Sequence, residues 1–269
     1  METTNRPFAV VTGASSGIGY ELARQFAEHG YDLLITSQHE HINDAERAIT
    51  SEFPVNVSSV QADLAAPDGV EQLYRKIQEC GRPVEAIAIN AGVGVSGDFA
   101  NETDLDDELN LIRLNVIAPV HLAKLVIKDM LRLSKGKVLF TSSIAGTMPA
   151  PFLAVYGASK AFLTSFGQAI RNELKDSGVT VTVLMPGATE TEFFHRAGME
   201  DTKIGASENK DDPAEVAKDG FEALMAGKDH VVAGSFKNKI QAAAGHVLPD
   251  PLMAGMHRKQ SEPGTATDR

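Results

Sequence analysis

Short apolar runs alternate with longer amphipathic stretches along most of the chain, as strands alternate with helices in an α/β domain. The apolar runs have the length of strands that are buried on both faces of a parallel sheet. They cover residues 8–11, 31–36, 55–61, 84–89, 137–141, 179–185 and 230–232. The amphipathic stretches predict helices over residues 20–29, 42–53, 68–80, 105–133, 152–177, 213–226 and 236–248, with a short helical segment at 191–197.

This alternation predicts a single α/β domain over residues 1–269, a doubly wound parallel sheet with helices on both faces. The regular pattern extends over residues 7–187, which we interpret as the core. Residues 188–212 are polar and mixed, and residues 261–269 are polar and expected to be disordered. Pro119 lies inside the longest helical stretch and is expected to bend or divide it.

Composition and charge narrow the function classes. The chain has 269 residues, of which 43% are hydrophobic, so it can bury a sizeable core. A net charge of −11 disfavours partners such as nucleic acid and anionic membranes. The single cysteine, Cys80, excludes an intrachain disulfide and fits a reducing compartment. No signal-like segment and no run of about 20 apolar residues is seen, so we expect a soluble, cytoplasmic protein.

A glycine loop follows the first predicted strand, with Gly13, Gly17 and Gly19 in the pattern G-x-x-x-G-x-G. Glycines permit a tight turn and a close approach of the backbone to a phosphate, and the next helix offers free N–H groups at its N-terminus. The loop sits at the first strand-to-helix junction of a βαβ unit, which favours nucleotide binding over a turn without a ligand.

Tyr156 and Lys160 are four residues apart on a predicted helix and therefore share one face. An ammonium group beside a phenol favours the phenolate and lowers the pKa of the tyrosine from its usual value of about 10. Such a pair also arises by chance, so its meaning depends on the motifs around it.

Those motifs closely resemble the short-chain dehydrogenase/reductase family. The resemblance rests on their order and spacing: Thr12-Gly13-x-x-x-Gly17-x-Gly19, Asn90-Ala91-Gly92, Asn115, Ser143, Tyr156-x-x-x-Lys160 and Pro186-Gly187. It extends over about residues 8–192. It implies a Rossmann-type fold and hydride transfer between a nicotinamide cofactor and a carbonyl or alcohol, and it implies no metal.

The resemblance implies four catalytic residues. Tyr156 is the proton donor in reduction, and Lys160 lowers its pKa and holds the nicotinamide ribose. Ser143 hydrogen-bonds the substrate oxygen, and Asn115 holds a water that links the site to solvent through Lys160. Ser143 has the alternative role of a turn residue, its neighbour Ser142 looks structural, and Asn115 has the alternative role of satisfying nearby backbone groups.

The resemblance also implies a set of cofactor-binding residues. Asp63 is expected near the adenine amine and Thr191 near the nicotinamide carboxamide, although both also fit helix caps. The full set is Gly13, Ser15, Ser16, Gly17, Ile18, Gly19, Ser37, Gln38, Asp63, Leu64, Asn90, Ala91, Gly92, Tyr156, Lys160, Pro186, Gly187 and Thr191.

The end of the second predicted strand bears on cofactor choice. A carboxylate there would bind ribose hydroxyls and select NAD, but this chain has Ser37 with Gln38 and His39 after it. The arginine of many NADP-dependent relatives is also missing. Ser15 and Ser16 offer hydroxyls for a 2′-phosphate. We expect NADP(H) rather than NAD(H).

The expected substrate site is apolar. In the family, the segment after Pro186-Gly187 closes over the substrate, and here it carries Phe193 and Phe194. Ser143, Ile144 and Phe152 complete the expected substrate residues, with ordinary core packing as the alternative for the apolar ones. The pattern favours a hydrophobic ketone or aldehyde. Residues 249–256 are expected to cover the pocket or to pack on another subunit.

Two other functions stay open. A 3-oxoacyl-carrier-protein reductase shares all the motifs, although its acidic partner is disfavoured by the charge of −11. A non-catalytic NADP-binding regulator would tolerate loss of Tyr156, Lys160 or Ser143, which are all present. By the same resemblance we expect a homodimer or homotetramer joined through the helices at 105–133 and 152–177.

Overall fold

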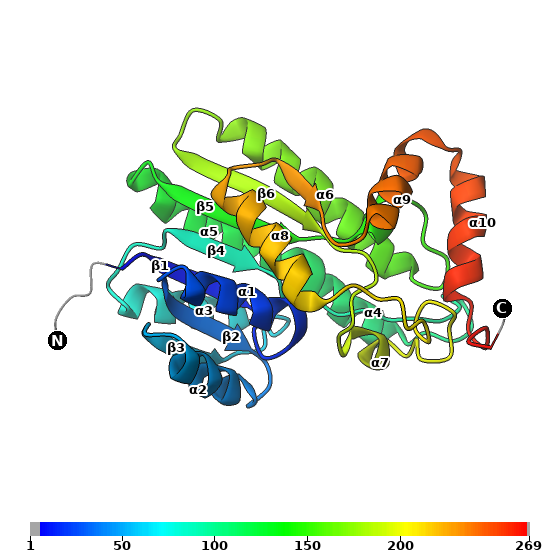
Figure 1. Cartoon of the computed structure of the whole chain (residues 1–269), viewed down its shortest axis with the longest axis horizontal. Coiled ribbons are helices and arrows are strands. Elements are labelled where there is room, and N and C mark those ends of the chain that lie inside the picture. The colour runs from blue at the N-terminus through cyan, green and yellow to red at the C-terminus, as the bar shows by residue number, and fades with distance from the viewer. Residues whose placement is uncertain (1–5, 268–269) are drawn as a thin grey trace.

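The computed structural model describes residues 6–267, which form one parallel sheet of seven strands in the order β3-β2-β1-β4-β5-β6-β7 (Figure 1). The strands are β1 (Phe8–Thr12), β2 (Asp32–Ser37), β3 (Val57–Gln61), β4 (Ala86–Ile89), β5 (Gly136–Thr141), β6 (Val179–Met185) and β7 (His230–Val232). The predicted Rossmann-type α/β fold is therefore confirmed.

The strand order reverses beside β1, which pairs with β2 on one side and with β4 on the other. Val10 at the centre of β1 stands in register with Leu34 and with Ile87. The chain leaves these neighbouring strands in opposite directions at their carboxyl ends. A crevice opens at such a switch point, which is where ligands bind in open α/β sheets.

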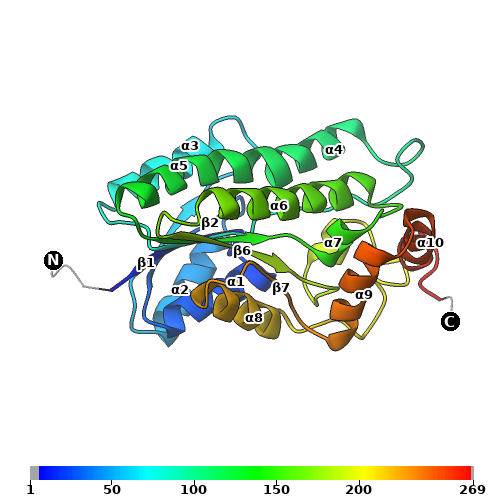
Figure 2. The ribbon, with the colours of Figure 1, turned by 90° about the horizontal axis from the view of Figure 1, so that it is seen from above.

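Helices cover both faces of the sheet (Figure 2). One layer holds α1 (Gly17–Glu28), α2 (Ile42–Glu52) and α8 (Pro213–Met225), and the other holds α3 (Gly69–Glu79), α4 (Leu105–Ile112), α5 (Ala118–Arg132) and α6 (Ala154–Glu173). The remaining helices lie near the carboxyl ends of the strands: α7 (Phe193–Arg196), α9 (Phe236–Val247) and α10 (Asp250–Ser261).

The strands alternate side chains between two apolar cores, one under each helical layer. Val10 and Phe140 point to the layer of α3, α5 and α6, whereas Val11 and Leu139 point to the layer of α1, α2 and α8. In the second core, Phe26 of α1 packs edge-on against Phe221 of α8, with ring centroids 5.1 Å apart. Both layers fix the ends of the strands at which the crevice opens.

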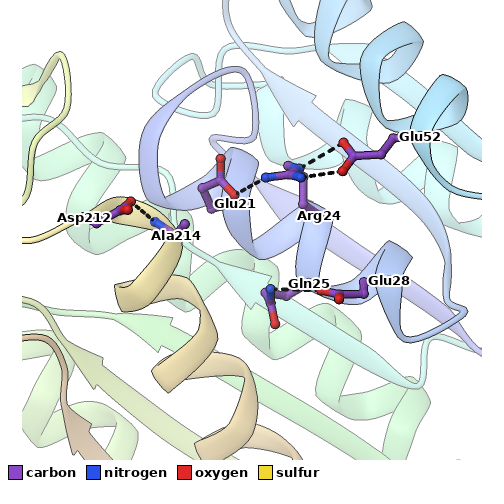
Figure 3. Close-up of polar contacts among 7 residues, drawn as sticks. All are labelled: Glu21, Arg24, Gln25, Glu28, Glu52, Asp212 and Ala214. Carbon is purple, nitrogen blue, oxygen red and sulfur yellow. Dashed lines mark hydrogen bonds and ion pairs between the residues drawn. The ribbon is translucent and has the colours of Figure 1, made fainter.

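Polar contacts reinforce the layer that contains α1 (Figure 3). The guanidinium of Arg24 donates to Glu52 of α2 at 2.5 Å and to Glu21 at 2.9 Å. The carboxylate of Asp212 accepts from the N–H of Ala214 at 2.8 Å and caps the start of α8. Exposed ion pairs are worth only about 0–1 kcal/mol, so these contacts orient α1, whose first turn faces the crevice, more than they stabilise it.

The predicted helix over 105–133 is divided. A five-residue π-helix, Arg113–Ile117, separates α4 from α5. Pro119 stands in the first turn of α5, and a proline ring clashes with the carbonyl four residues earlier, here that of Asn115. The backbone before the proline instead adopts π-helical hydrogen bonding, in which the N–H of Ala118 donates to the carbonyl of Arg113, five residues earlier. The division expected at Pro119 thus occurs just before it.

The helical run 105–132 is long and apolar enough to cross a membrane, judged by length and composition alone. Its most apolar 18-residue window has a mean hydropathy of 1.4, and 44% of that window is buried within the protein. Leu122 and Val126 of α5 belong to the apolar core beneath it, so packing on the sheet accounts for part of the apolar character of this run.

The C-terminal segment departs from expectation. Residues 261–269 were predicted to be disordered, but Ser261 is fully buried at the end of α10. The N–H groups of Gly264 and Ala266 then donate to the side chain and to the carbonyl of Asp201. Polar composition does not signal order of this kind, because it arises from backbone hydrogen bonds to a distant loop. Residues 268 and 269 lie outside the described part of the chain.

Candidate active site

One cavity of about 700 Å³ lies at the carboxyl ends of the strands and brings together residues from the whole length of the chain. The predicted cofactor residues all line it: Gly13, Ser15, Ser16, Gly17, Ile18, Gly19, Ser37, Gln38, Asp63, Leu64, Asn90, Ala91, Gly92, Tyr156, Lys160, Pro186, Gly187 and Thr191. Ser143, Ile144, Phe193 and Phe194 of the predicted catalytic and substrate sets line it as well. Asn115 and Phe152 do not.

The glycine loop needs its glycines because of both conformation and space. Gly13 and Gly17 have φ angles of +67° and +56°, in the left-handed region that glycine adopts freely. A Cβ at Gly13 would lie 2.8 Å from the Cα of Ala91, and one at Gly17 would lie 2.9 Å from the Thr191 side chain. The loop therefore packs directly on the end of β4 and on the segment after β6.

Thr12, which precedes the loop, ties it to the predicted Asn90-Ala91-Gly92 turn. Its hydroxyl accepts from the N–H groups of Asn90 at 2.9 Å and Ala91 at 3.0 Å. The Asn90 amide donates to the Thr12 carbonyl at 3.2 Å. The Asn90 side chain is therefore used as scaffold, and its turn forms the floor of the cavity.

At the end of β2, hydroxyls take the place of a carboxylate. The hydroxyls of Ser15 and Ser37 lie 2.9 Å apart, and Ser37 also accepts from the N–H of His39. Asp63 lines the same end of the cavity, where one of its oxygens accepts from the N–H of Ala65 at 2.9 Å. This contact is a local turn in the loop before α3, whose N-cap residue is Asp68, so Asp63 does not take the alternative role of a helix cap.

The two serines at the end of β5 have different surroundings. Ser142 is buried, and its hydroxyl donates to the Lys160 carbonyl at 2.7 Å and lies 2.8 Å from the hydroxyl of Thr164. Ser143 caps a 3₁₀-turn, accepts from the N–H of Ala145 at 3.1 Å and hydrogen-bonds the Tyr156 hydroxyl. Ser142 therefore has structural contacts, whereas Ser143 faces the hydroxyl of Tyr156.

Lys160 is 4% exposed, and its ammonium donates to the Thr141 carbonyl at 2.9 Å. It lies 5.7 Å from the centre of the Tyr156 ring. No carboxylate pairs with it among residues 6–267. The lysine is therefore held beside the tyrosine as a buried cation with only a carbonyl oxygen to stabilise it.

Burial dominates the acid–base properties of this pair. It raises the pKa of Tyr156 to about 12, although the hydrogen bond from Ser143 acts in the opposite direction. Burial also lowers the pKa of Lys160 to about 8. The predicted lowering of the tyrosine pKa by Lys160 is thus absent from this structure, because removal from water disfavours both charged forms.

Asn115 lies in the π-helix and is fully buried away from the cavity. Its amide accepts from the N–H of Val93 at 3.0 Å and donates to the carbonyl of the same residue at 2.9 Å. It also donates to the hydroxyl of Ser159, which in turn donates to the Tyr156 carbonyl. The alternative role, satisfying nearby backbone, describes this side chain, and its part in a water relay stays a prediction.

The segment after Pro186-Gly187 crosses the cavity, as the sequence predicted. Thr191 lies against Gly17, and its hydroxyl accepts from the N–H of Phe193 at 3.3 Å, whereas the N-cap residue of α7 is Glu192. The Phe193 ring lies 5.1 Å from the Tyr156 ring and 5.6 Å from that of Phe194. Apolar rings thus stand directly beside the Tyr156 side chain.

Phe152 was predicted in the substrate site, but the structure places it elsewhere. Its backbone adopts a φ of +63°, and its ring faces the guanidinium of Arg258 at 4.8 Å. The next residue, Leu153, lines the cavity instead. The reversal of the chain at Phe152 before α6 exchanges the two side chains, and no sequence periodicity reports such a reversal.

Sequence reasoning missed residues that reach the cavity from the C-terminal helices. Asn238 of α9 is buried, and its amide donates to Asp211 at 2.6 Å and to the Ala233 carbonyl at 2.9 Å. It leaves no room for a Cβ at Gly187. Met253 and Met256 of α10 line the cavity, which fits one of the two roles expected for residues 249–256. His257, Gln260 and Ser261 were missed and line it as well. Spacing along the same helical face was the only signal for these three.

The cavity fits a nicotinamide dinucleotide. The first turn of α1 carries no acidic residue, and its N-cap residue Ser16 makes no side-chain cap, so its N–H groups are free for a phosphate. Ser37, Gln38 and Asp63 line the cavity where they would hold an adenosine, and Tyr156 and Lys160 line it where they would hold the nicotinamide half. These residues would hold the two halves of the cofactor.

A reductase is among the proteins that this chain resembles in sequence. The very-long-chain 3-oxoacyl-CoA reductase-B of Danio rerio is 31% identical over 185 residues, which cover 66% of this chain and 58% of that protein. This chain thus spans less than two thirds of that relative.

Solved structures agree. A short-chain dehydrogenase from Sphingobium yanoikuyae in complex with NADPH is 29% identical, with a TM-score of 0.78 over 84% of this chain and 87% of that one. The bulky-bulky ketone specific alcohol dehydrogenase from Comamonas testosteroni is 25% identical, with a TM-score of 0.76 over 89% and 92% of the two chains.

The model of the short chain dehydrogenase family matches residues 7–201, which include the glycine loop, the catalytic pair and the segment after Pro186-Gly187. The match extends over more than half of the chain, and the resemblance drawn from the motifs is confirmed. The chain belongs to the short-chain dehydrogenase/reductase family of NAD(P)-dependent oxidoreductases.

Proposed function

We propose that the protein reduces a hydrophobic ketone or aldehyde with NADP(H), using Tyr156 as the proton donor. The observation that carries the proposal is the Tyr156 hydroxyl, which is bonded to Ser143 in a cavity that continues from the glycine loop into an apolar pocket. Protein groups for proton transfer, charge stabilisation and nucleotide binding thus meet in one space.

When bound, the nicotinamide supplies or accepts the hydride at the carbonyl carbon. In reduction the carbonyl oxygen gains negative charge, which the hydroxyls of Ser143 and Tyr156 stabilise by donating hydrogen bonds. Tyr156 then transfers its proton to that oxygen and leaves the alcohol. Because the tyrosine pKa is raised to about 12, the phenol carries its proton at neutral pH and is ready as a general acid.

The surroundings of Tyr156 support a hydrophobic substrate. The cavity around it is lined by the apolar side chains of Met148, Leu153, Phe193 and Met199. Among the described residues, the acidic side chains that reach this end are those of Glu192 and Asp211. The Comamonas testosteroni relative is specific for bulky ketones, which also supports this class.

NADP(H) is favoured by the end of β2. The Ser15 and Ser37 hydroxyls lie side by side there. Position 37, which lines the cavity, carries a hydroxyl instead of a carboxylate that would repel a 2′-phosphate. We expect a lower KM for NADPH than for NADH. Ser37→Asp should reverse this preference. A wild-type preference for NADH would contradict the assignment.

The decisive experiment follows NADPH oxidation with a panel of aliphatic, aromatic and 3-oxoacyl carbonyl compounds. Tyr156→Phe should lower kcat by about 10²–10⁴-fold, the usual contribution of a general acid. Tyr74→Phe is the matched control, because the Tyr74 hydroxyl bonds Asp129 on α5, away from the cavity. Equal activities of the two variants would overturn the role of Tyr156.

A 3-oxoacyl thioester is the second candidate substrate. Arg196, Lys203 and Lys237 line the mouth of the cavity, and no ion pair engages them among residues 6–267. These cations suit the phosphates of a coenzyme A or carrier-protein substrate despite the net charge of −11. Faster turnover of a 3-oxoacyl-CoA than of any simple ketone would favour it. NADPH binding without any turnover would favour the non-catalytic regulator instead.

We further propose a homodimer or homotetramer in the cytoplasm. Leu109, Ile117 and Phe162 expose apolar side chains on α4, the π-helix and α6, which lie in the same layer (Figure 2).

The single cysteine supports a reducing compartment, and fractionation of cells that produce the protein tests the location.

A further inference from the structure

The last helix, α10, turns one ridge of side chains toward the cavity. Met253, His257 and Ser261 follow each other at four-residue intervals and are 1%, 8% and 0% exposed. All of them line the cavity. The neighbouring Leu252 points away and is 53% exposed. The helix therefore presents a thioether and two polar groups to the space beside the catalytic pair.

Contacts on two sides of its C-terminal half fasten this helix across the cavity. Toward the catalytic side, the His257 ring hydrogen-bonds the Pro151 carbonyl and the Arg258 guanidinium covers the Phe152 ring. Toward the other side, the Gln260 carbonyl accepts from the N–H of Ile204 at 2.9 Å. Residues 151–152 lead into α6 and its tyrosine, whereas Ile204 belongs to the segment after Pro186-Gly187. The helix joins the two walls.

His257 is matched to this position as a neutral imidazole. Burial lowers its pKa, so one ring nitrogen carries a proton and the other does not at neutral pH. One nitrogen bonds Pro151, and Nδ1 lies 3.2 Å from the hydroxyl of Ser261. The hydrogen-bond donor and the acceptor of the neutral ring are therefore both used within the protein. His257 holds the helix in place and has no ring nitrogen left to bind a ligand.

We propose that α10 is the wall that sets the size of substrate the enzyme accepts, with Met253 in contact with the apolar group of the carbonyl compound and His257 as the residue that positions the wall. Met199 and Met148 line the same cavity. Methionine is unbranched and adapts its shape, so a pocket bounded by these three thioethers accepts bulky alkyl or ring groups of varied outline. The inference rests on the proposed carbonyl reduction.

The test compares Met253→Ala with Leu252→Ala in the full chain, on a homologous series of ketones from small to bulky. Met253→Ala should raise KM at least 10-fold for the bulky ketone that wild type prefers, the size expected when apolar contact in a pocket is lost. The Kd for NADPH should stay within twofold of wild type, and the rise in KM should be much smaller for the smallest ketone than for the bulky one. Leu252→Ala should change none of these values.

His257 is tested by its own pair of variants. His257→Phe fills the space without the hydrogen bonds and should raise KM for the bulky ketone, while kcat for the smallest ketone holds. His257→Gln keeps one donor and one acceptor and should restore most of the loss. Equal KM effects of Met253→Ala and Leu252→Ala, or losses that are the same for small and bulky ketones, would overturn the proposal.

Failure of the proposed function gives a different result. If wild type binds NADPH but reduces no carbonyl compound, calorimetric titration of the NADPH-loaded protein with the bulky ketone measures the wall directly. A Kd that weakens with Met253→Ala and holds with Leu252→Ala supports the wall without catalysis. A Kd that is unchanged by Met253→Ala rejects it.

Discussion

Tyr156 and Lys160 illustrate how burial can reverse an expectation drawn from charge alone. At the residue scale, the four-residue spacing placed them side by side, as predicted, and implied that the ammonium stabilises the phenolate. The cavity also removes both groups from water, and this effect is larger for each. The tyrosine therefore holds its proton more firmly, which suits a donor, and the lysine holds its proton less firmly, which costs stability.

Lys160→Met tests that cost in the protein without nucleotide. Because the pKa of Lys160 falls from 10.5 to about 8 on folding, the unfolded state binds more protons between these pH values, and the unfolding free energy of wild type rises with pH across this window. Below pH 8, burying the charged ammonium lowers the unfolding free energy of wild type by up to about 3 kcal/mol, and the variant avoids this loss. The variant also lacks the hydrogen bond to Thr141, which contributes about 1 kcal/mol.

We therefore expect Lys160→Met to raise the Tm at pH 7 by roughly 4–8 °C while it abolishes reduction, and to lose this advantage near pH 10.5. Differential scanning fluorimetry across pH measures it. Lys175→Met at an exposed position is the control and should be neutral. A variant that is less stable than wild type at pH 7 would show that the ammonium is well accommodated.

Individual residues differed in how far the sequence revealed them. Ser143 was distinguished from Ser142 by its spacing from Tyr156, and its hydrogen bond to that tyrosine fits this assignment. Phe152 was misplaced, because the positive φ that turns it toward Arg258 depends on contacts with α10, more than one hundred residues later. Spacing within a motif carries over to the structure, but long-range packing does not show in local patterns.

At the scale of elements, the π-helix between α4 and α5 is the irregularity with the clearest purpose. It places the Asn115 amide against both backbone groups of Val93, at the end of β4 where no further strand pairing is available. The same amide reaches Ser159 on α6. One side chain thus joins the β4 end, the divided helix and the helix that carries the catalytic pair.

Asn115→Ala should lower the free energy of unfolding by about 2–4 kcal/mol, because it leaves the buried N–H and C=O of Val93 without partners. Urea denaturation measures the change. Asn110→Ala, in the exposed part of α4, is the matched control and should fall within about 0.5 kcal/mol of wild type. A loss below 1 kcal/mol for Asn115→Ala would mean that water replaces the amide.

The strands and helices of the core were largely predictable, because buried strands and amphipathic helices have characteristic patterns of apolar residues in the sequence. The strand predicted at 179–185 corresponds to β6 without change, and the one at 230–232 to β7. The last helix, α10, was not predicted. It and the following turn are held by single hydrogen bonds to Asp201, Ile204 and Pro151 rather than by a repeating pattern.

At the scale of the whole molecule, the site and the exposed apolar helix face lie in different places. Residues of α7, α9 and α10 line the cavity. These helices lie at one end of the molecule, whereas α4, α5 and α6 lie along one of its long sides (Figure 2). Leu109 and Phe162, each 38% exposed, lie on that side. Association through it would leave the cavity mouth accessible.

The double variant Leu109→Glu with Phe162→Glu should therefore reduce the molar mass in solution to that of one chain, with NADPH binding retained. Light scattering during size exclusion measures the mass. Phe236→Glu is the control, because this 75% exposed residue lies on α9 near the cavity. A wild-type protein that is already monomeric would refute the proposed assembly.

The contact between Gly17 and Thr191 has a consequence for the order of events in each catalytic cycle. The methyl group of Thr191 leaves no room for a Cβ at Gly17, so the segment that bounds the substrate pocket also lies across the entrance of the nucleotide cleft. We expect compulsory ordered kinetics, with NADPH first to bind and NADP⁺ last to leave. Product inhibition by the alcohol should then be noncompetitive with NADPH, and a competitive pattern would exclude this order. In an ordered cycle, opening of this contact sets how quickly the spent nucleotide departs and how soon the next turnover begins.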